Sequence, residues 1–600
     1  MNAAQTHRGP DDHGVAKIEF GRGEVLFGST RLAIIDTSAA GHQPMNDPQT
    51  GNWITYNGET YNFKQLRLEI GNHSWFSNTD TEVVLRAYGK WGVDVFRRMR
   101  GMFALAIWDH AKQELLLARD TLGIKPLYYY VAQNQLVFAS EMRALLASGL
   151  VPGRLSASGV DSFLSNGSVA SPLTIVDEVK QLLPGHCLRV RADESGKIRL
   201  HETEFSRSNN KDTPGSRDEA VARLRFELED SVRHHLVSDV PLGVFLSGGM
   251  DSSALVALMH GMNERPKTFS VVFDEDAFTE APFSRAVAKR FNTDHSEIRL
   301  NEDRLIQILP DAIAAIDQPT MDGINTFVVS RAVKHAGITV ALSGLGGDEL
   351  FAGYPSFRRA LKVAAMSSVS KRVLRAAAGV GRVALNGSVQ RHKFWQLANS
   401  SGSPGEVYGI SRQLFSNDSI AQMTGREVDL YATNGNKHSG DAINAISTLE
   451  LKGYMTNTLL RDTDAMSMAH SLEVRVPFVD TKVIDYVLSL PGEWKLPAKN
   501  SVPKPLLAEA LADLLPRDLL ARPKMGFTLP FEKWLQRNLR REVSSVLQDS
   551  QRLSSAALNG KAVARIWNSF LEKPRAVGWS RPWSLYVLAK WCEINGVSCS

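Results

Sequence analysis

Two glycine-rich segments, each placed after an apolar run, contain the residue types that bind phosphate. The first, SGGMDSS at 247–253, follows the run VPLGVFL. Two glycines let backbone N–H groups at a helix start approach a phosphate, and the serine hydroxyls add donors. Asp251 would repel that phosphate unless a cation stands between them, so the segment predicts Mg²⁺ beside a nucleotide phosphate. Taken alone, such a turn is as often structural as functional.

The second segment, SGLGGDE at 343–349, adds the support that a single motif lacks. It follows the apolar run ITVAL, so it also lies where a buried strand is expected to end. Ligands of parallel sheets bind at the carboxyl ends of the strands. Asp348 in this segment can share a magnesium ion with Asp251. The two segments together predict one nucleotide site.

The order of apolar and polar runs predicts the elements that position these loops. Up to about residue 150, short apolar runs between Gly, Asn and Asp turns indicate antiparallel strands, interrupted by helical spacing at 63–70 and 80–92. Residues 204–217 are polar, contain Pro and Gly, and are the predicted linker. Beyond them strands and helices alternate, as in a parallel α/β sheet, and helices dominate from about residue 400.

Composition narrows the classes of function. A length of 600 residues exceeds one core, so two or more domains are expected. The 69 Lys and Arg against 64 Asp and Glu give a net charge of +5, too small a bias to indicate nucleic acid. The three cysteines fit no zinc or disulfide pattern, and Cys187 is expected in a strand. We find no transmembrane run and no apolar core of a signal peptide, so we expect a cytoplasmic protein.

The glycine-rich segments resemble those of the asparagine synthetase family. SGGMDSS resembles its pyrophosphate loop, which other ATP-pyrophosphatases share, and SGLGGDELFAGY resembles its second nucleotide loop. Residues 459–480 and 522–535 resemble two further blocks of the synthetase domain, and the similarity runs from His7 to about residue 590. The resemblance implies a parallel α/β ATP-pyrophosphatase domain with a helical C-terminal part, which uses ATP and Mg²⁺.

The resemblance also implies roles for single residues. Asp251 and Asp348 match magnesium ligands. Lys504 matches a lysine that neutralises charge as pyrophosphate leaves, a role that suits the charge on the bridging oxygens. The other matched positions hold the adenosine (Leu246, Val271, Ser343 and Gly344) or form the pyrophosphate loop (Ser247, Gly249, Asp251 and Ser252).

One residue of the second loop departs from the family pattern. In members where this position helps to form or consume the acyl-adenylate it is acidic or a tyrosine, whereas here it is Leu345. A leucine neither accepts a proton nor binds a metal. Either another group does that work, or the acceptor pocket differs from that of an aspartate-using enzyme.

The first part of the chain resembles class II glutamine amidotransferases, whose fold is the N-terminal-nucleophile αββα sandwich. The matching segments are HRGPDDHG, RLAIID, YNGETYN, SNTDTEV and ARDTLGIKPLYY. The resemblance implies that Arg31 and Asp80 hold the α-carboxylate and α-amine of glutamine. It also implies that Asn57 and Gly58 form the oxyanion hole and that Glu59 contacts the substrate.

The nucleophile of that family is a cysteine whose own α-amine activates the thiol. Six residues precede HRGPDDHG here, none of them able to serve, and the nearest cysteine in the sequence, Cys187, has no free amine. Either the protein uses free ammonia, or an in-frame start upstream of Met1 adds the missing strand and a free-amine cysteine. We favour the second explanation, because the residues that grip glutamine are all present.

We therefore predict two domains of α/β class. The boundaries are an amidotransferase domain at 1–203, a linker at 204–217 and a synthetase domain at 218–600. In the predicted reaction ATP adenylates a carboxylate, in the first place the aspartate side chain, and ammonia from glutamine displaces AMP. The expected partners are these small molecules, without nucleic acid, and a homodimer is compatible with the sequence.

Other functions stay open. The same chemistry on another carboxylate, such as a sugar uronic acid, is mildly favoured by Leu345 and by the basic stretch 358–393. An ammonia-dependent form without glutaminase activity and a catalytically silent homologue remain, although the intact SGGMDSS loop opposes the latter. A tRNA-modifying ATP-pyrophosphatase is disfavoured by the weak net charge and the lack of paired cysteines.

Overall fold

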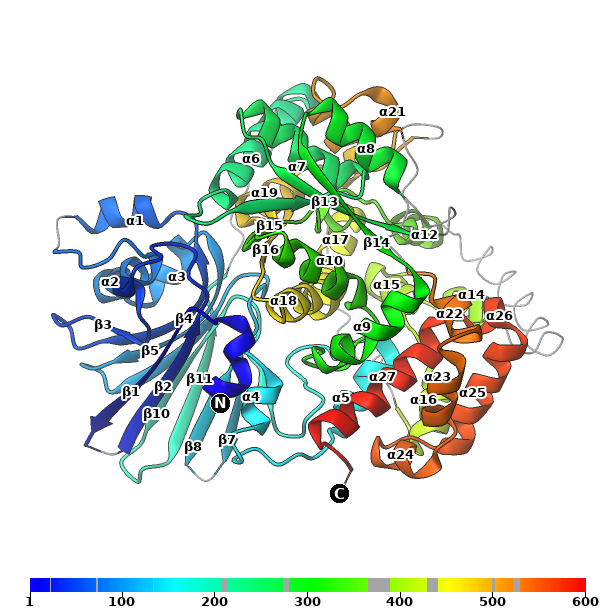
Figure 1. Cartoon of the computed structure of the whole chain (residues 1–600), viewed down its shortest axis with the longest axis horizontal. Coiled ribbons are helices and arrows are strands. Elements are labelled where there is room, and N and C mark those ends of the chain that lie inside the picture. Colours follow the sequence, from blue (N-terminus) through cyan, green and yellow to red (C-terminus); the bar gives the residue numbers. More distant parts are fainter. Residues whose placement is uncertain are drawn as a thin grey trace.

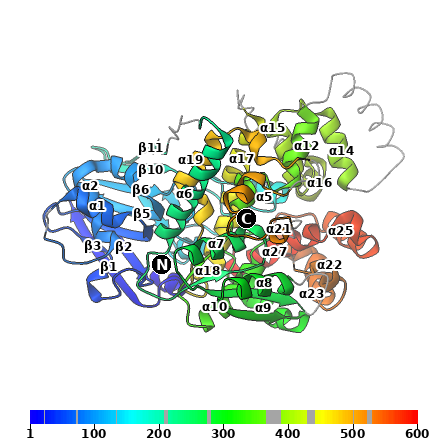
Figure 2. The same cartoon turned by 90° about the horizontal axis from the view of Figure 1, so that it is seen from above.

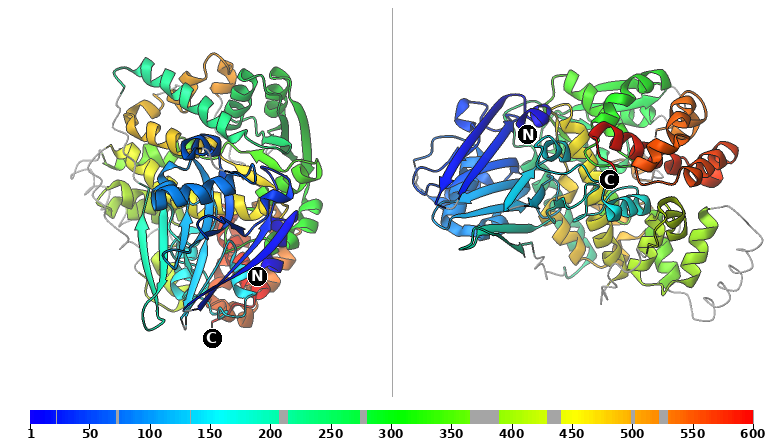
Figure 3. Two further views of the ribbon diagram at one scale, coloured as in Figure 1. Left: turned by 90° about the vertical axis from the view of Figure 1, so that its left-hand side faces the viewer. Right: turned by 90° about the horizontal axis from the view of Figure 1, so that it is seen from below.

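The structure, a computed structural model, describes residues 1–21, 23–71, 74–132, 134–206, 214–273, 280–364, 389–428, 441–498, 502–521 and 529–599. A sheet-rich N-terminal part sits beside a larger part of parallel strands and helices (Figure 1). Figure 2 and the right panel of Figure 3 show the blue and cyan sheets on one side and the green to red helices on the other. Within the described ranges, no helix is long and apolar enough to cross a bilayer.

Antiparallel strands build the N-terminal part. One sheet has the order β11-β10-β6-β5-β4-β3, a hairpin pairs β1 with β2, and a further sheet has the order β8-β7-β9. The bounds are β1 (Asp12–Phe20), β2 (Gly23–Arg31), β3 (Met45–Asn46), β4 (Trp53–Thr60), β5 (Gly101–Asp109), β6 (Glu114–Arg119), β7 (Tyr128–Ala132), β8 (Gln135–Ala139), β9 (Lys180–Gln181), β10 (His186–Ala192) and β11 (Ile198–Glu204).

Side chains that alternate along the strands bury both faces of these sheets. Leu105 of β5 packs in a core with α1 (Phe63–Ile70) and α2 (Asp80–Trp91). Trp108, three residues further along β5, faces the other way and packs with Tyr129 of β7. Tyr130 of β7 in turn faces α4 (Met142–Leu146) and α5 (Ala157–Asn166). The layers therefore follow the order helix, sheet, sheet, helix.

A parallel sheet forms the centre of the second part. Its strand order is β14-β13-β12-β15-β16, and each neighbouring pair is parallel. Phe269 and Ala341 face one core, and Val244 and Leu342 face another, so both sides are covered, as a parallel sheet requires. The bounds are β12 (Leu242–Phe245), β13 (Lys267–Phe273), β14 (Asp294–Leu300), β15 (Val340–Leu342) and β16 (Glu473–Arg475).

Helices cover this sheet and make up the C-terminal region. A π-helix, Leu451–Leu460, leads directly into α18. The other bounds are α3 (Val95–Arg98), α6 (Arg217–His235), α7 (Met250–Gly261), α8 (Ala281–Arg290), α9 (Glu302–Ala314), α10 (Ile324–His335), α11 (Gly347–Leu350), α12 (Pro355–Ala364), α14 (Val389–Asn399), α15 (Pro404–Arg412), α16 (Asn417–Thr424), α17 (Ala442–Glu450), α18 (Arg461–Met468), α19 (Thr481–Ser489), α20 (Pro505–Ala510), α21 (Arg517–Leu520), α22 (Phe531–Gln536), α23 (Arg540–Leu547), α24 (Ser550–Ser555), α25 (Gly560–Glu572), α26 (Pro574–Val577) and α27 (Ser580–Asn595).

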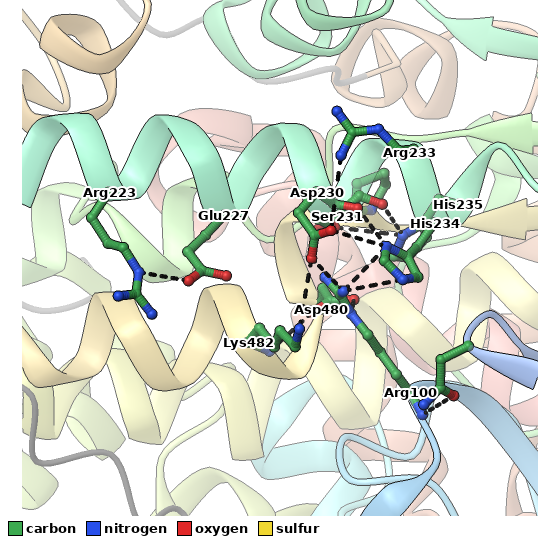
Figure 4. A network of polar contacts seen from close by, with 12 residues as sticks. Arg100, Arg223, Glu227, Asp230, Ser231, Arg233, His234, His235, Asp480 and Lys482 are labelled. Carbon is green, nitrogen blue, oxygen red and sulfur yellow. Dashed lines mark hydrogen bonds and ion pairs between the residues drawn. The ribbon is translucent and has the colours of Figure 1, made fainter. Parts of the chain in front are cut away.

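A network of charges joins the two parts (Figure 4). Arg100, which precedes β5, donates from Nε to Asp480 at 2.8 Å and from Nη1 to Asp230 of α6 at 2.5 Å. The side chains of Arg100 and Asp480 are only 6% and 2% exposed. Because a buried charge is costly without its partner, this contact helps to fix how the first part docks on the second.

The predicted α/β fold class, with an αββα first part and a parallel sheet in the second, is confirmed. Cys187 lies in β10, as expected. The predicted linker at 204–217 lies partly outside the described residues, and the domain boundaries stay predictions. Residues 365–388 of the basic stretch and 522–528 of the last family block also lie outside them.

We expect Arg100→Ala to lower the free energy of unfolding by about 3 kcal/mol, because Asp480 is left buried without its guanidinium. Arg98→Ala is the matched control. It removes a pair with Glu69 whose side chains are 48% and 37% exposed, so the expected change is below about 0.5 kcal/mol. Urea unfolding followed by circular dichroism measures both. Equal losses in the two variants would contradict a role for the buried pair.

Candidate active site

The first glycine-rich segment, 247–253, forms a tight turn between β12 and α7, which we call the cradle. Gly248 has a φ of +72°, and a Cβ there would lie 2.7 Å from its nearest neighbours, so the turn requires glycine. The Oγ of Ser252 accepts from the N–H of Ser247 at 3.2 Å and lies 3.1 Å from the Ser247 Oγ. α7 begins directly afterwards, with Gly249 as its N-cap. The cradle thus presents N–H groups and hydroxyls at a helix N-terminus, where anions bind.

The second glycine-rich segment packs directly on the cradle. A Cβ on Gly347 would lie 2.5 Å from the carboxyl group of Asp251, and one on Gly344 would lie 2.9 Å from the backbone N of Ser252. Neither position has room for a larger residue. Their smallness brings Asp348, in α11, close to Asp251, although the two residues are almost a hundred positions apart.

Lys504 lies between these two carboxylates. Its Nζ is 2.7 Å from Oδ1 of Asp251 and 2.6 Å from Oδ1 of Asp348. The residue is 6% exposed. Burial alone would lower the pKa of Lys504, but the two carboxylates raise it above the ordinary value. The backbone of Lys504 has a φ of +49°, uncommon for a residue with a side chain, and α20 begins at the next residue.

The two carboxylates suit a magnesium ion that is bound together with a nucleotide. Mg²⁺ usually takes one or two protein carboxylates and completes its six ligands with phosphate oxygens and water. Asp251 and Asp348 both reach one ammonium group, so they lie close enough to share a small cation. Among the described residues, no group of three or more His, Cys, Asp and Glu could hold a metal alone. Phosphate oxygens would therefore be needed as further ligands.

The predicted adenosine positions lie on three neighbouring strands. Leu246 follows β12, Ser343 and Gly344 follow β15, and Val271 lies within β13. The side chains of Leu246 and Val271 belong to the core, at 1% and 7% exposure. Leu345 is partly buried and packs against the core that includes α6 and α7, so it brings no polar group to the second loop.

A cavity of about 870 Å³ in the first part includes all the predicted glutamine-binding residues in its lining. Arg31 is anchored there by backbone carbonyls: it donates to Ser38 at 3.0 Å, to Ile35 at 3.2 Å and to Asp36. Carbonyl groups hold the guanidinium without cancelling its charge, so Arg31 can bind a carboxylate. The other predicted residues in the lining are Asn57, Gly58, Glu59 and Asp80.

Asp80, at the start of α2, supplies a negative charge to the same cavity. It accepts a hydrogen bond from the N–H of Thr60 at 2.8 Å. Burial raises the pKa of Asp80 to about 6, although the hydrogen bonds that it accepts oppose this. A bound ammonium group would stabilise its ionised form. Arg31 and Asp80 together offer the two opposite charges that an amino-acid headgroup needs.

The predicted oxyanion residues lie next to each other in β4. Asn57 donates from Nδ2 to the Oγ of Ser140 at 3.1 Å. Gly58 passes so close to β5 that a Cβ would lie 2.2 Å from the carbonyl oxygen of Met102. Glu59 points to the second part, where it pairs with Arg475 at 3.5 Å. The five predicted residues are therefore brought together, while their roles stay predictions.

The same cavity follows the edges of two strands. β2 and β8 each end their sheet, and consecutive residues of both, 23–32 and 134–140, line the cavity. Neighbouring side chains of a strand point to opposite faces, so a cavity lined by consecutive residues runs along the backbone. We call this space the edge slot. It has the form that an extended segment would fill, and none of the three cysteines lines it.

Sequence reasoning missed the residues that the second part brings to this region. Arg475 pairs with Glu473 at 2.8 Å, and Lys125 of the first part lies 3.6 Å from Glu473 and 3.3 Å from Asp464. Glu473, Arg475 and Asp464 all belong to the block 459–480. The density of charge in that block is the signal that could have indicated an interface.

Two sites of different chemistry thus occur in one chain. The cavity of the first part suits an amino acid, and the cradle of the second suits the phosphates of a nucleotide. Paired carboxylates and a fixed ammonium group at the cradle suit the activation of a carboxylate with ATP. Such a combination defines an ATP-dependent ligase that forms carbon–nitrogen bonds.

Comparison with known proteins gives the family. Residues 223–593 match the family model described as asparagine synthase, and residues 1–201 match the model described as glutamine amidotransferase domain. The chain belongs to the asparagine synthase family. This membership confirms the predicted resemblance and the class of enzyme.

Relatives in other organisms are similar along much of the chain. Asparagine synthetase [glutamine-hydrolyzing] 1 of Bacillus subtilis is 32% identical over 99% of this chain and 93% of its own length. Asparagine synthetase [glutamine-hydrolyzing] 3 of the same organism is 31% identical over 91% of this chain and 87% of its own length. Amidase chry2 of Gibberella zeae is 32% identical over 59% of this chain and 54% of its own length.

We expect Asp251→Asn to reduce ATP–pyrophosphate exchange by at least about 100-fold. The substitution removes one of the two negative charges that hold Lys504 and would hold a magnesium ion. Asp303→Asn is the control, since Asp303 is also an acid in the first turn of a helix. Radiolabelled pyrophosphate exchange measures both variants, and thermal unfolding shows that they are folded. Substantial exchange by a folded Asp251→Asn protein would sink the assignment.

Proposed function

We propose that this protein forms an amide from a carboxylate and ammonia at the expense of ATP, with the aspartate side chain as acceptor. The observation that carries the proposal is the position of Lys504 between Asp251 and Asp348, where the two glycine-rich segments meet. The choice of aspartate is supported by relatives named asparagine synthetase, which match more than nine-tenths of the chain.

The first step would activate the acceptor. A carboxylate oxygen attacks the α-phosphorus of ATP, the bond to the bridging oxygen breaks, and pyrophosphate leaves. Lys504, fixed by its two partners, would neutralise the negative charge that grows on the departing oxygens. A magnesium ion held by Asp251 and Asp348 would supply further positive charge to the phosphates when bound.

The second step would form the amide. Ammonia attacks the acyl carbon of the adenylate, AMP leaves with the electrons of the broken carbon–oxygen bond, and the nitrogen loses a proton. Buried surroundings favour this step over hydrolysis, because water competes with ammonia for the same carbon.

Glutamine is the proposed source of ammonia. Arg31 would bind its α-carboxylate and Asp80 its α-ammonium, while Asn57 and the N–H of Gly58 would stabilise the tetrahedral intermediate. The cavity is also lined by Met468 and Glu473 of the second part. Ammonia released there would therefore already face the boundary between the two parts.

Glutamine cleavage by the predicted route also needs a cysteine thiol, and none of the three cysteines lines the cavity. We infer that an extended segment with a cysteine at its free end works in the edge slot. The open backbone edges of β2 and β8 offer the donors and acceptors that such a segment would pair with.

A second acceptor class keeps the same chemistry. A sugar uronic acid is favoured by Leu345, which supplies neither an acid nor a hydroxyl to the second loop. One relative of the chain is named amidase rather than asparagine synthetase, so its relatives are not all named for the same activity.

With ATP, Mg²⁺ and aspartate, we expect the chain 1–600 to form product with ammonium but not with glutamine, because no thiol lines the glutamine cavity. Chromatography of the amide product and of glutamate measures both arms. Asn57→Ala, which alters the glutamine cavity, shows whether any glutamate released comes from that cavity. Release of glutamate from glutamine at a rate that Asn57→Ala abolishes would contradict this expectation.

Because Leu345 is apolar, we expect either poor use of aspartate or help from another acid, and Glu349 is the candidate. It is 1% exposed and accepts a 2.6 Å hydrogen bond from the hydroxyl of Tyr354. Glu349→Gln should lower kcat with aspartate about tenfold or more.

Glu542→Gln, which also neutralises a carboxylate that accepts from a tyrosine hydroxyl, is the control for this variant. Steady-state kinetics with aspartate measure both variants. Rapid turnover that Glu349→Gln leaves unchanged would show that Leu345 has no consequence for the reaction.

A further inference from the structure

A group of tyrosines around Arg412 begins where the nucleotide site ends. Tyr354 donates to Glu349, the residue after Asp348. Gly353, the residue before Tyr354, lies against the nucleotide site itself, since a Cβ there would be 2.7 Å from Cε of Lys504. The guanidinium of Arg412 lies over the ring of Tyr354 at 4.7 Å from the centroid.

A second tyrosine also packs on Arg412. The guanidinium lies 4.0 Å from the ring centroid of Tyr454, so two aromatic rings contact it. Tyr454 belongs to the π-helix Leu451–Leu460, and its N–H donates to the hydroxyl of Tyr408 at 3.2 Å. π-Helical turns are rare and occur frequently at functional sites.

Arg412 keeps one nitrogen for a ligand. It donates from Nε and Nη2 to the buried carboxylate of Glu450, at 3.0 and 2.6 Å. Among the residues that the structure describes, Nη1 has no hydrogen-bond partner, and a quarter of the side chain is exposed. The ion pair and the two rings fix the guanidinium, while Nη1 is left to donate to a carboxylate oxygen.

Asp322 supplies the opposite charge on the far side of Tyr454. It accepts from the N–H of Gly323 at 2.9 Å and from the hydroxyl of Tyr454 at 3.5 Å. No cation pairs with it within the described ranges, and Asp462 is a second carboxyl group close by. Burial raises the pKa of Asp322, which means that its ionised form lacks a compensating charge.

We propose that Arg412 and Asp322 bind the α-carboxylate and the α-ammonium of the acceptor amino acid, with Tyr354 and Tyr454 packed beside it. The proposal rests on the proposed function and adds the residues that would recognise the acceptor. Tyr354 lies between Arg412 and Glu349, the residue next to Asp348. With its α-carboxylate on Arg412, the acceptor would therefore direct its side-chain carboxylate past Tyr354 to the cradle.

The charges select against acceptors of other kinds. A bound ammonium group gives Asp322 the partner that the protein does not supply, whereas a uronic acid or a simple dicarboxylate brings none. Two analogues separate the two halves of the site. Succinate is aspartate without its amino group, and β-alanine is aspartate without its α-carboxylate.

The test measures kcat/KM in ATP–pyrophosphate exchange with aspartate, succinate and β-alanine. Asp322→Asn should reduce the preference for aspartate over succinate at least about tenfold, the size of one lost charged hydrogen bond. Arg412→Lys, which keeps a charge for Glu450, should reduce the preference for aspartate over β-alanine by a similar factor. The KM for ATP should stay unchanged in both variants.

Asp161→Asn and Arg426→Lys are the matched controls, because these two residues form an ion pair of their own at 2.6 Å in another region. They should leave all the ratios unchanged. If aspartate drives exchange in the wild type and neither ratio shifts in the variants, the proposed site is wrong while the proposed function stands. If D-galacturonate drives exchange and aspartate does not, the proposed function fails and the amino-acid site fails with it.

Discussion

Buried charges that find partners across the boundary between the two parts constrain the whole molecule. Glu59 of the first part meets Arg475 of the second, and Lys125 of the first meets Glu473 and Asp464 of the second. The series continues to Arg8 and Glu141, alternates in sign, and consists of side chains at most 6% exposed. If the parts slipped past each other, Glu59 and Lys125 would lose these partners, and a buried charge without its partner is costly. The docking that satisfies the charges is also the one that places Glu473 in the lining of the glutamine cavity.

Buried charges also need partners at the nucleotide site, but there the residues that the structure describes do not supply all of them. Asp251 and Asp348 carry two negative charges, and Lys504 supplies one positive charge between them. The group as a whole keeps one uncompensated negative charge, so it attracts a further cation before it can tolerate phosphates. The interface network, by contrast, pairs four carboxylates with four cations, because Glu141 also pairs with Arg143 at 2.9 Å. Charge balance therefore distinguishes a network that holds the structure together from one that is prepared for a ligand.

How much was predictable from the sequence follows from how local each feature is. The cradle was predictable, since Gly248, Gly249 and Asp251 must stand at fixed spacing for a backbone turn to bind phosphate. The αββα and parallel layers were predictable from the apolar runs and from the resemblance. The edge slot was not, because strand pairing decides which edges stay open. The contact of Arg412 with Tyr454 was not predictable either, since it depends on a π-helical turn that apolar spacing does not reveal.

Two arginines placed at the proposed amino-acid sites are anchored in opposite ways, and the difference has a physical consequence. Arg31 is held by carbonyl dipoles and keeps its full charge, so it can attract a carboxylate strongly. Arg412 is held by the carboxylate of Glu450, which cancels much of its field, and by two aromatic rings. It therefore contributes direction more than attraction, and the ammonium group held by Asp322 has to supply much of the binding free energy. An acceptor site built in this way selects the amino group of its substrate before the carboxylate, although both sites bind the same kind of headgroup.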